Sequence, residues 1–268
     1  MSIPSLDHSE SAIVTRLRTA GCVFAEDEAQ MIMSAAGNAA ELEEMVERRV
    51  VGLPLEHVVG YAEFRGLRIE VDAEVFVPRR RTEALVHEAA QLTPARGAVV
   101  VDLCCGSGAL GVALAAALEE VELHAADVDP AAVRCARRNV TAAGGEIYEG
   151  DLFAPLPSGL KGRVDVLLSN VPYVPTVEIE LLPAEARDHE ARVALDGGVD
   201  GLEVMRRVVA EAADWLAPGG VLLFETSERQ ADEAVAAVTG AGLHARVATD
   251  DELDATVIIA SRSDAPAP

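Results

Sequence analysis

The sequence predicts an α/β protein built on a doubly wound, mostly parallel sheet of seven strands. From residue 98 onward, short apolar runs alternate with segments of helical periodicity, which is the pattern of repeated strand–helix units. Several runs are almost wholly apolar, as expected of strands that helices cover on both faces. Half of the 268 residues are hydrophobic, which is enough for the large core that this fold requires.

Before this pattern begins, residues 9–53 have the periodicity of short helices. Ser9 and Asp27 are expected to cap the first two helices, and residues 41–51 supply a third. Each helix has one apolar face, but these faces are too few for a large core of their own. We therefore predict a small helical domain over residues 1–56.

A linker and a tail flank the main domain in this prediction. Residues 61–77 alternate apolar and polar side chains with a Gly near the start, which indicates a β-hairpin, and Pro78 ends it. The linker is therefore assigned to residues 57–80 and the main domain to residues 81–260. The tail, 261–268, is rich in Ala, Pro, Ser and Asp and is expected to be disordered.

The order of elements within the main domain follows from its apolar pattern. Strands are expected at 98–103, 123–126, 146–148, 164–168, 221–224, 243–248 and 255–260. Helices are expected at 81–91, 108–118, 130–141, 201–216 and 229–238. The segment 173–195 is long for a loop, so we expect it to close over a site.

Polar residues and glycines follow four of the strands at their carboxyl ends. They are Gly106-Ser107-Gly108, Asp127, Asp151 and Asn170. Ligands of doubly wound sheets bind beyond the carboxyl ends of the strands, near the point where the strand order reverses. These four groups should therefore meet at one edge of the sheet and form a site.

The loop around Gly106 and Gly108 indicates one half of that site. Glycines at these positions let a ligand approach the backbone closely. The loop lacks the full GxGxxG pattern and the Lys-Ser/Thr of a phosphate-binding loop, so a nucleoside without phosphates fits better. Asp127 lies about 20 residues further on, where a carboxylate can bind ribose hydroxyls.

The stretch Asn170-Val171-Pro172-Tyr173 indicates the other half. The Asn170 amide both donates and accepts hydrogen bonds, and Pro172 keeps the residue before it extended. Such a turn can direct backbone carbonyls outward, and Tyr173 adds a flat wall with a polar tip. The stretch is predicted to clamp a small planar group. The competing interpretation is a strand followed by an ordinary Pro-bearing loop.

The charge of the chain argues against nucleic acid as its main partner. With 45 acidic and 22 basic residues, the formal net charge is −23, which repels phosphate backbones. The single basic triplet, Arg79-Arg80-Arg81, is interpreted as a solvated loop. The other interpretation is a role in steering an acidic partner or cofactor.

The cysteines and the apolar runs indicate the compartment. Cys22, Cys104, Cys105 and Cys135 lack metal-binding spacing and are interpreted as reduced core thiols of a cytoplasmic protein without a metal. No run approaches the roughly 20 apolar residues of a membrane span. The N-terminus lacks the basic and apolar pattern of a signal peptide.

Together, the motifs resemble those of the class I methyltransferases that use S-adenosylmethionine, and more closely those of the HemK/PrmC family of protein-glutamine methyltransferases. The resemblance runs from about residue 53 to residue 260. It is carried by Phe64-Arg65-Gly66-Leu67, Val77-Pro78-Arg79, Thr82-Glu83, Asp102-Leu103, Gly106-Ser107-Gly108, Asp127, Asp151-Leu152-Phe153, Ser169-Asn170-Val171-Pro172-Tyr173, and the stretches 185–190 and 195–202.

The resemblance implies the Rossmann-like fold of class I methyltransferases, with the helical residues 1–56 as a substrate-docking domain. It implies S-adenosyl-L-methionine as the cofactor, with the ribose hydroxyls on Asp127. The methionine moiety would lie against Cys104, Cys105, Gly106, Ser107 and Gly108, and the adenine beside Asp151 and Leu152. Asn170 would lie near both cofactor and substrate.

The substrate that the resemblance implies is a glutamine side chain of a protein, usually in the Gly-Gly-Gln loop of a class I peptide-chain release factor. Asn170 Oδ1 and the Val171 carbonyl would accept the two N–H groups of its amide. That arrangement orients the nitrogen for attack and favours the positive charge that grows on it. Pro172 and Tyr173 complete the clamp, with the Tyr173 ring against the flat amide.

Three departures from the family pattern bear on the substrate more than on the reaction. Cys104 stands at the usual first Gly of the loop, and Val171 at the second position of the usual Asn-Pro-Pro-Tyr. Arg80 and Arg81 stand where Pro and an acidic residue are usual. Three further candidates stay outside the catalytic set. For His189 the reason is that the transfer needs no strong base, so a loop-stabilising ion cluster is the favoured interpretation. Glu225 could be a helix cap, a sheet-edge contact or a substrate contact, and Glu83 could anchor the first helix of the catalytic domain to the cofactor loop.

Two other functions stay open from the sequence. One is methylation of an exocyclic amine of a nucleic acid, with a flipped base in place of the amide, or of a small molecule. The other is a catalytically inactive module that only binds S-adenosylmethionine. We expect a monomeric enzyme that acts on a protein, away from membranes, with nucleic acid disfavoured by the charge.

Overall fold

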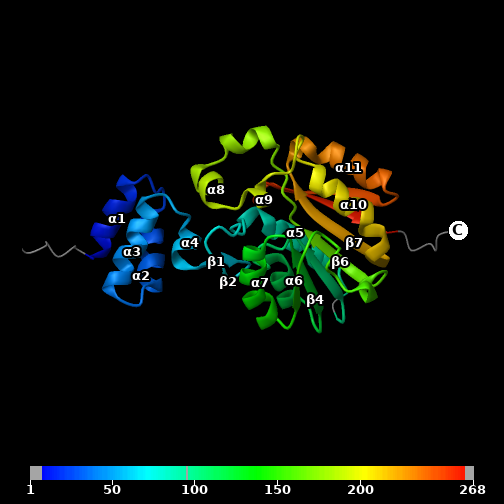
Figure 1. The fold of residues 1–268 in the computed structure, drawn as a ribbon, viewed down its shortest axis with the longest axis horizontal. Helices are drawn as coiled ribbons and strands as arrows, with labels where there is room; N and C mark the ends of the chain where they lie inside the picture. The colour runs from blue at the N-terminus through cyan, green and yellow to red at the C-terminus, as the bar shows by residue number, and fades with distance from the viewer. Residues whose placement is uncertain (1–7, 95, 263–268) are drawn as a thin grey trace, which may run out of the picture.

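The computed structural model describes residues 8–94 and 96–262 and confirms the predicted fold class (Figure 1). Its seven-stranded sheet has the order β5-β4-β3-β6-β7-β9-β8. The strands are β3 (Val99–Leu103), β4 (Glu122–Asp127), β5 (Glu146–Glu149), β6 (Val164–Ser169), β7 (Leu216–Thr226), β8 (His244–Asp250) and β9 (Ala255–Ser261). The first five pair in parallel, and β9 runs antiparallel to both of its neighbours. The strand order reverses between β3 and β6, which is where the predicted site lies.

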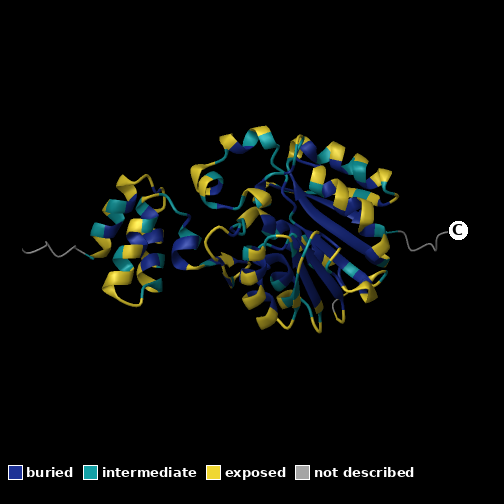
Figure 2. Ribbon diagram, in the orientation of Figure 1, coloured by how far each residue is buried: buried dark blue, intermediate teal, exposed yellow. Residues whose placement is uncertain are grey.

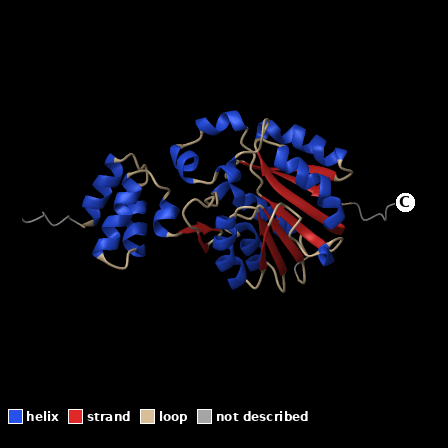
Figure 3. Cartoon of the chain, viewed as in Figure 1, coloured by secondary structure: helices blue, strands red, loops and turns tan. Residues whose placement is uncertain are grey.

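Helices cover both faces of this sheet (Figure 3). The helices of the main domain are α5 (Glu83–Leu92), α6 (Ala109–Ala117), α7 (Pro130–Ala142), α10 (Glu203–Trp215) and α11 (Ala231–Gly240). Leu85 of α5 and Leu114 of α6 belong to one buried apolar cluster, whereas Val208 of α10 and Val238 of α11 belong to another. In Figure 2 the central strands are dark blue and the outward faces of the helices are yellow, as in a three-layer fold with two cores.

The N-terminal residues form a separate helical body with its own small core. Its helices are α1 (Glu10–Thr19), α2 (Ala25–Ala35), α3 (Ala39–Val50) and α4 (Leu55–Val59). The Ser9 cap is confirmed, but the Asp27 cap is wrong, because α2 begins at Ala25 and Asp27 lies in its first turn. The predicted domain boundary at residue 56 falls inside α4, which packs against α2 and α3.

The predicted hairpin is confirmed but shorter than its sequence pattern. Strands β1 (Tyr61–Phe64) and β2 (Leu67–Glu70) pair antiparallel around a two-residue turn. Arg65 and Gly66 both have positive φ, 49° and 75°, which is the backbone of a tight hairpin turn with the natural strand twist. The tail prediction needs a correction at its start, because Ser261 ends β9; residues 263–268 lie outside the described residues.

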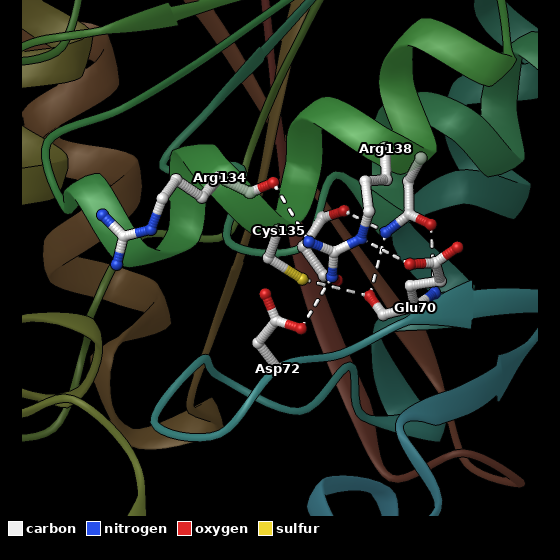
Figure 4. Close-up of polar contacts among 7 residues, drawn as sticks. Glu70, Asp72, Arg134, Cys135 and Arg138 are labelled. Carbon is white, nitrogen blue, oxygen red and sulfur yellow. Dashed lines mark hydrogen bonds and ion pairs between the residues drawn. The ribbon is translucent and has the colours of Figure 1, made fainter.

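The end of the hairpin is fastened to α7, as Figure 4 shows. The Arg138 guanidinium donates to the carboxylates of Glu70 and, at 2.7 Å, Asp72. The Cys135 thiol donates to the backbone carbonyl of Glu70 at 3.2 Å, and burial raises its pKa to about 11. Cys135 is therefore a protonated packing residue, as the sequence predicted.

One buried amide joins the hairpin to the glycine loop. Asn139 Nδ2 donates to the carbonyl oxygens of Glu70 and Ser107, each at 2.9 Å, and its Oδ1 accepts from the Glu70 N–H at 3.0 Å. Asn139 of α7 therefore links the hairpin and the glycine loop through its hydrogen bonds. Within residues 8–94 and 96–262, no helix has the length and the apolar character to cross a membrane.

Candidate functional site

The carboxyl ends of β3, β4, β5 and β6 open onto one cavity of about 680 Å³. Its walls include the residues that the sequence predicted for both halves of the site: Cys104, Cys105, Gly106, Ser107, Asp127, Asp151, Leu152, Asn170, Val171, Pro172 and Tyr173. Gly108 does not line the cavity. The structure thus brings four separate strand ends to one place, as expected for ligand binding at a topological switch point.

Gly108 serves the packing of the loop instead. It has a φ of 81°, and a Cβ built there would lie 2.7 Å from Val140 Cγ2 of α7. Its N–H donates to the Cys105 carbonyl at 2.7 Å. Only a glycine lets α6 begin this close to α7. Gly108 therefore positions the glycine loop by packing against α7 and does not face the cavity.

Cys104 occupies a backbone conformation that glycine would adopt more easily. Its φ is 53°, in the left-handed region, which costs an L-residue about 1–2 kcal/mol. The thiol is half-buried against the apolar cluster under the loop, and burial is the largest cause that raises its pKa. The departure from Gly is therefore accommodated by packing of the side chain.

Asp127 holds the loop in place and also faces the cavity. Its Oδ2 accepts from the Gly106 N–H at 2.8 Å, and its Oδ1 accepts from the Asp129 N–H at 2.9 Å. Burial raises the pKa of this carboxyl, while those two hydrogen bonds lower it. Each oxygen keeps a further lone pair, so the carboxylate can accept two hydroxyl groups from a ribose.

Asp151 and Leu152 lie at the end of β5, beside the same space. Leu152 is buried with a φ of 47°, and its side chain joins the core next to Phe153. Asp151 is exposed and accepts from Arg207 Nη2 at 2.5 Å. An apolar side chain beneath and a polar rim beside it suit the faces and edges of a purine.

The clamp at the end of β6 presents an acceptor that nothing satisfies among the described residues. Asn170 Oδ1 is buried and has no hydrogen-bond partner in that part of the chain. Val171 and Pro172, which follow it, are buried. A buried polar atom without a hydrogen-bond partner lowers the stability of the fold by about 1–3 kcal/mol. A ligand that donates a hydrogen bond to this oxygen would recover that free energy. Asn170 is one of the residues that line the cavity, together with the glycine loop.

Tyr173 is fixed by three polar partners that the sequence did not indicate. Its hydroxyl donates to Glu225 Oε1 at 2.7 Å and accepts from Arg81 Nη2 at 2.6 Å. Its carbonyl accepts from Gln230 Nε2 at 3.0 Å. Burial and the Glu225 carboxylate raise the pKa of Tyr173, so the phenol stays protonated and its ring is held as one wall of the cavity.

The interpretation of the basic triplet as a solvated loop misses ion pairs that two of its three arginines form. Arg79 pairs at 2.6 Å with Glu190, whose side chain is fully buried. Arg81 Nε pairs at 2.9 Å with Glu225, which is 2% exposed. Two buried carboxylates are thereby paired at the edge of the cavity. Arg80 and Arg81 are exposed, as a solvated loop predicts, and Arg79 is half-buried.

The segment 173–195 is folded, where the sequence predicted a loop. It contains a 3-10 helix η3 (Thr176–Leu181) and the short helices α8 (Ala184–His189) and α9 (Arg192–Leu195). Leu182, Ala186 and Leu195 line the cavity from this side, so the segment does cover the site. In Figure 1, α8 lies between the N-terminal helices and the sheet.

A charged contact ties this cover to the helical body. Arg49 of α3 is buried and donates to Glu28 of α2 at 2.6 Å and to Glu185 of α8 at 2.7 Å. Glu185 also lines the cavity. Of the residues left outside the catalytic set, His189 does not line the cavity, and Glu83 accepts a hydrogen bond from the Arg65 N–H at 3.1 Å.

Asp102, which begins the glycine-loop motif, is fully buried beneath the site. Its Oδ2 accepts from the Gly111 N–H at 2.8 Å, and its Oδ1 has no partner among the described residues. Burial raises the pKa of this carboxyl to about 7. The folded protein therefore binds a proton at Asp102 that the unfolded chain releases near its ordinary pKa of about 3.9.

This shift predicts a stability that falls as the pH rises through the folded-state pKa. Between about pH 5.5 and about pH 8, the free energy of unfolding should drop by about 2 kcal/mol from Asp102 alone. Asp102→Asn keeps an acceptor for Gly111 and should remove that part of the drop. Urea unfolding of both proteins at the two pH values measures it, and an equal drop in both would contradict the assignment.

The comparisons with known proteins agree with this geometry. The family model described as the methyltransferase small domain matches residues 80–198. A release factor glutamine methyltransferase of Geobacter sulfurreducens is 40% identical over 190 residues, which cover 70% of this chain and 66% of the relative, just under two thirds of its length. Another from Deinococcus radiodurans is 40% identical over 208 residues, 76% of this chain and 73% of the relative.

A solved structure supports the fold independently of sequence. A methyltransferase from Pyrococcus furiosus superimposes with a TM-score of 0.54 at 19% identity, over 74% of this chain and 90% of that one. At that identity the likeness shows the fold alone. No group of three or more His, Cys, Asp or Glu side chains suited to a metal occurs in the described ranges.

Proposed function

The chain belongs to the release factor glutamine methyltransferases, and from this premise we propose that it methylates the side-chain amide nitrogen of a glutamine in a class I release factor. The cofactor is S-adenosyl-L-methionine. The observation that carries the proposal is the unpartnered, buried Oδ1 of Asn170, a residue that lines the same cavity as the glycine loop and Asp127. A hydrogen-bond acceptor is what an amide nitrogen about to gain positive charge requires.

The residues that line the cavity at the ends of β3, β4 and β5 fit a nucleoside that carries an amino acid. We assign the backbone of Cys104, Cys105, Gly106 and Ser107 to the methionine moiety, and Asp127 to the ribose hydroxyls. Asp151 and Leu152 are assigned to the adenine. When bound, S-adenosylmethionine supplies an electrophilic methyl group on a sulfonium. The acidic side chains at this edge, Asp127 and Asp151, favour a ligand of positive charge.

The clamp then acts on the amide. Asn170 Oδ1 and the Val171 carbonyl would accept its two N–H groups, which fixes the nitrogen and supports the positive charge that develops there. Val171 keeps the carbonyl that the usual Pro would provide, so this function survives the substitution. The amide proton becomes acidic only after transfer, so no residue needs to act as a strong base.

The remaining walls of the cavity exclude water and contact the flat face of the amide. The Tyr173 ring, held through Arg81, Glu225 and Gln230, would pack on the face of the amide. Leu182 and residues of α8 and α9 line the cavity on the side of the N-terminal body. Exclusion of water strengthens every hydrogen bond to the developing charge. We extend the proposal to residues 1–56 as the docking domain and to a monomeric, cytoplasmic enzyme.

Removing the hydroxyl of Tyr173 tests its part in the clamp. Tyr173→Phe should lower kcat about fivefold to tenfold, because the ring loses the two hydrogen bonds that orient it. Tyr173→Ala should lower kcat more strongly, because the wall itself is lost. Steady-state kinetics with a release factor measure both, and calorimetry should show cofactor affinity within about threefold of wild type. Equal kcat for wild type and both variants would contradict the assignment.

The proposed substrate is tested by incubating the protein with a lysate and S-adenosylmethionine labelled in its methyl group. Mass spectrometry of the labelled band is expected to identify a class I release factor. Label in nucleic acid would instead support the exocyclic-amine alternative. Binding of the cofactor without labelling of any macromolecule would support an inactive module or a small-molecule substrate.

A further inference from the structure

A second cavity, of about 390 Å³, lies behind the tyrosine wall of the first. Arg81 and Tyr173 line both cavities, so the two spaces adjoin at this pair of residues. The remaining wall comes from the carboxyl end of β7 and from the turn between β8 and β9. A peptide whose glutamine enters the first cavity therefore passes close to the second.

The second cavity is strongly acidic. Its lining includes five carboxylates, which are Glu225, Glu228, Asp250, Asp251 and Asp254, and Arg81 is the one basic residue among them. Asp250 has a structural task, since its Oδ1 accepts from the N–H groups of Glu252 and Leu253 in the turn. Glu225 accepts hydrogen bonds from Arg81 and Tyr173. The carboxylates of Glu228, Asp251 and Asp254 are exposed, so the electrostatic potential of this cavity attracts a cation.

Glu225 at the base of this cavity has an unsatisfied oxygen. It is 2% exposed, and its Oε1 already accepts from both Arg81 and Tyr173. Its Oε2 is buried and has no hydrogen-bond partner in the described part of the chain. Leaving a charged oxygen unpaired costs free energy, and a donor arriving with a ligand would recover it.

The chemistry favours an organic cation over a metal ion. Over residues 8–94 and 96–262, no three acidic or thiol groups come together in a way that could hold a metal. The carboxylates instead spread from the buried Glu225 to the exposed Glu228, Asp251 and Asp254 at the rim. That distribution suits a long side chain, with its charged end inside and its stem across the rim.

We propose that this second cavity is a subsite for the Lys or Arg side chain of a protein substrate, at a position near the methylated glutamine. This inference rests on the proposed function and specifies the substrate further. Its ligand is an ammonium or guanidinium group, bound by the rim carboxylates and Glu225. Tyr173 would then separate the amide site from the cation site.

The rim carboxylates allow a test that leaves the clamp intact. Asp251→Asn/Asp254→Asn removes two charges, and Asn tolerates the φ of 51° at position 254. With the protein substrate at low ionic strength, KM should rise about tenfold and kcat should stay within about twofold, because exposed charges contribute to binding and not to the reaction. The rise should shrink in high salt.

Glu233→Gln/Glu252→Gln is the matched control. It removes two charges from exposed residues of α11 and the same turn that do not line the cavity. Its KM should stay within about twofold of wild type. An equal rise in the control would mean a general effect of net charge and would overturn the subsite.

A double-mutant cycle identifies the side chain that is bound. Each Lys and Arg that flanks the glutamine in the substrate is changed to Gln, one at a time. One of these changes should raise KM for the wild-type enzyme and have no further effect on the rim variant. Additive effects at every position would overturn the inference. If the labelled protein is not a release factor, the proposed target fails, and the same cycle on that protein decides the subsite.

Discussion

Replacing Asn170 by alanine is expected to lower the turnover number about 10²- to 10³-fold, which is the usual loss when one preorganised hydrogen-bonding group of a transition-state site is removed. Asn170 Oδ1 is buried and unpartnered in the described structure, so its capacity is reserved for the substrate. Without it, one amide N–H of the glutamine loses its acceptor, and the growing positive charge loses its nearest dipole. Single-turnover transfer of labelled methyl to a release factor measures the effect.

Two further measurements separate this effect from misfolding and from lost cofactor. The affinity of Asn170→Ala for S-adenosylmethionine should stay within about threefold of wild type by calorimetry, because Asp127 and the glycine loop are unchanged. Val171→Pro is the matched control at the neighbouring residue, since it keeps the backbone carbonyl and should remain active. Undiminished methylation by Asn170→Ala would show that the clamp is not the reacting site.

Replacing Asp127 by alanine is expected to weaken binding of S-adenosylmethionine about 100-fold, since hydrogen bonds to a charged group contribute about 1.5–3 kcal/mol. The variant loses two effects at once. The ribose loses its acceptors, and the Gly106 and Asp129 N–H groups lose the carboxylate that accepts from them at 2.8 and 2.9 Å. Titration calorimetry measures the loss directly.

Two variants calibrate this result. Asp127→Asn keeps one acceptor oxygen and should lose only about tenfold in affinity. Glu149→Gln removes a negative charge from the residue paired with Asp127 in the neighbouring strand, but Glu149 is exposed and does not line the cavity, so affinity should be unchanged. If Asp127→Ala bound as tightly as Glu149→Gln, the ribose assignment would be wrong.

The strands and the converging site residues could be predicted from sequence because both follow local rules. Buried strands such as β3 are apolar almost throughout, and the residue after a parallel strand always lies at the same edge of the sheet. Asn170 and Asp127 could therefore be placed together without knowing the strand order.

The contacts that hold Tyr173 could not be found by such rules. Arg81 and Glu225 are 144 residues apart, and their pairing depends on how α5 and β7 pack. A run of arginines is usually solvated, so the local pattern did not indicate the ion pairs of Arg79 and Arg81. The Arg49–Glu185 contact between the helical body and α8 is equally remote in sequence.

The short helices of the cover left a signal that could have been used. Pro175 directly precedes η3, and Pro183 directly precedes α8, as proline often does at the start of a helix. The helices are only one or two turns long, so their apolar periodicity is too brief to detect. Asp27 misled in the opposite way, because acidic residues favour the whole first turn of a helix and not the cap alone.

The central claim is that the clamp at the end of β6 holds a glutamine amide for methylation. Its most direct test incubates the purified protein with S-adenosylmethionine and an unmethylated class I release factor, and then maps the modified peptide by mass spectrometry. The account predicts one methyl group on the side-chain nitrogen of the glutamine in the Gly-Gly-Gln loop, and none with Asn170→Ala in the same time. A methyl group on any other residue, or an unmodified release factor beside an enzyme saturated with cofactor, would contradict it.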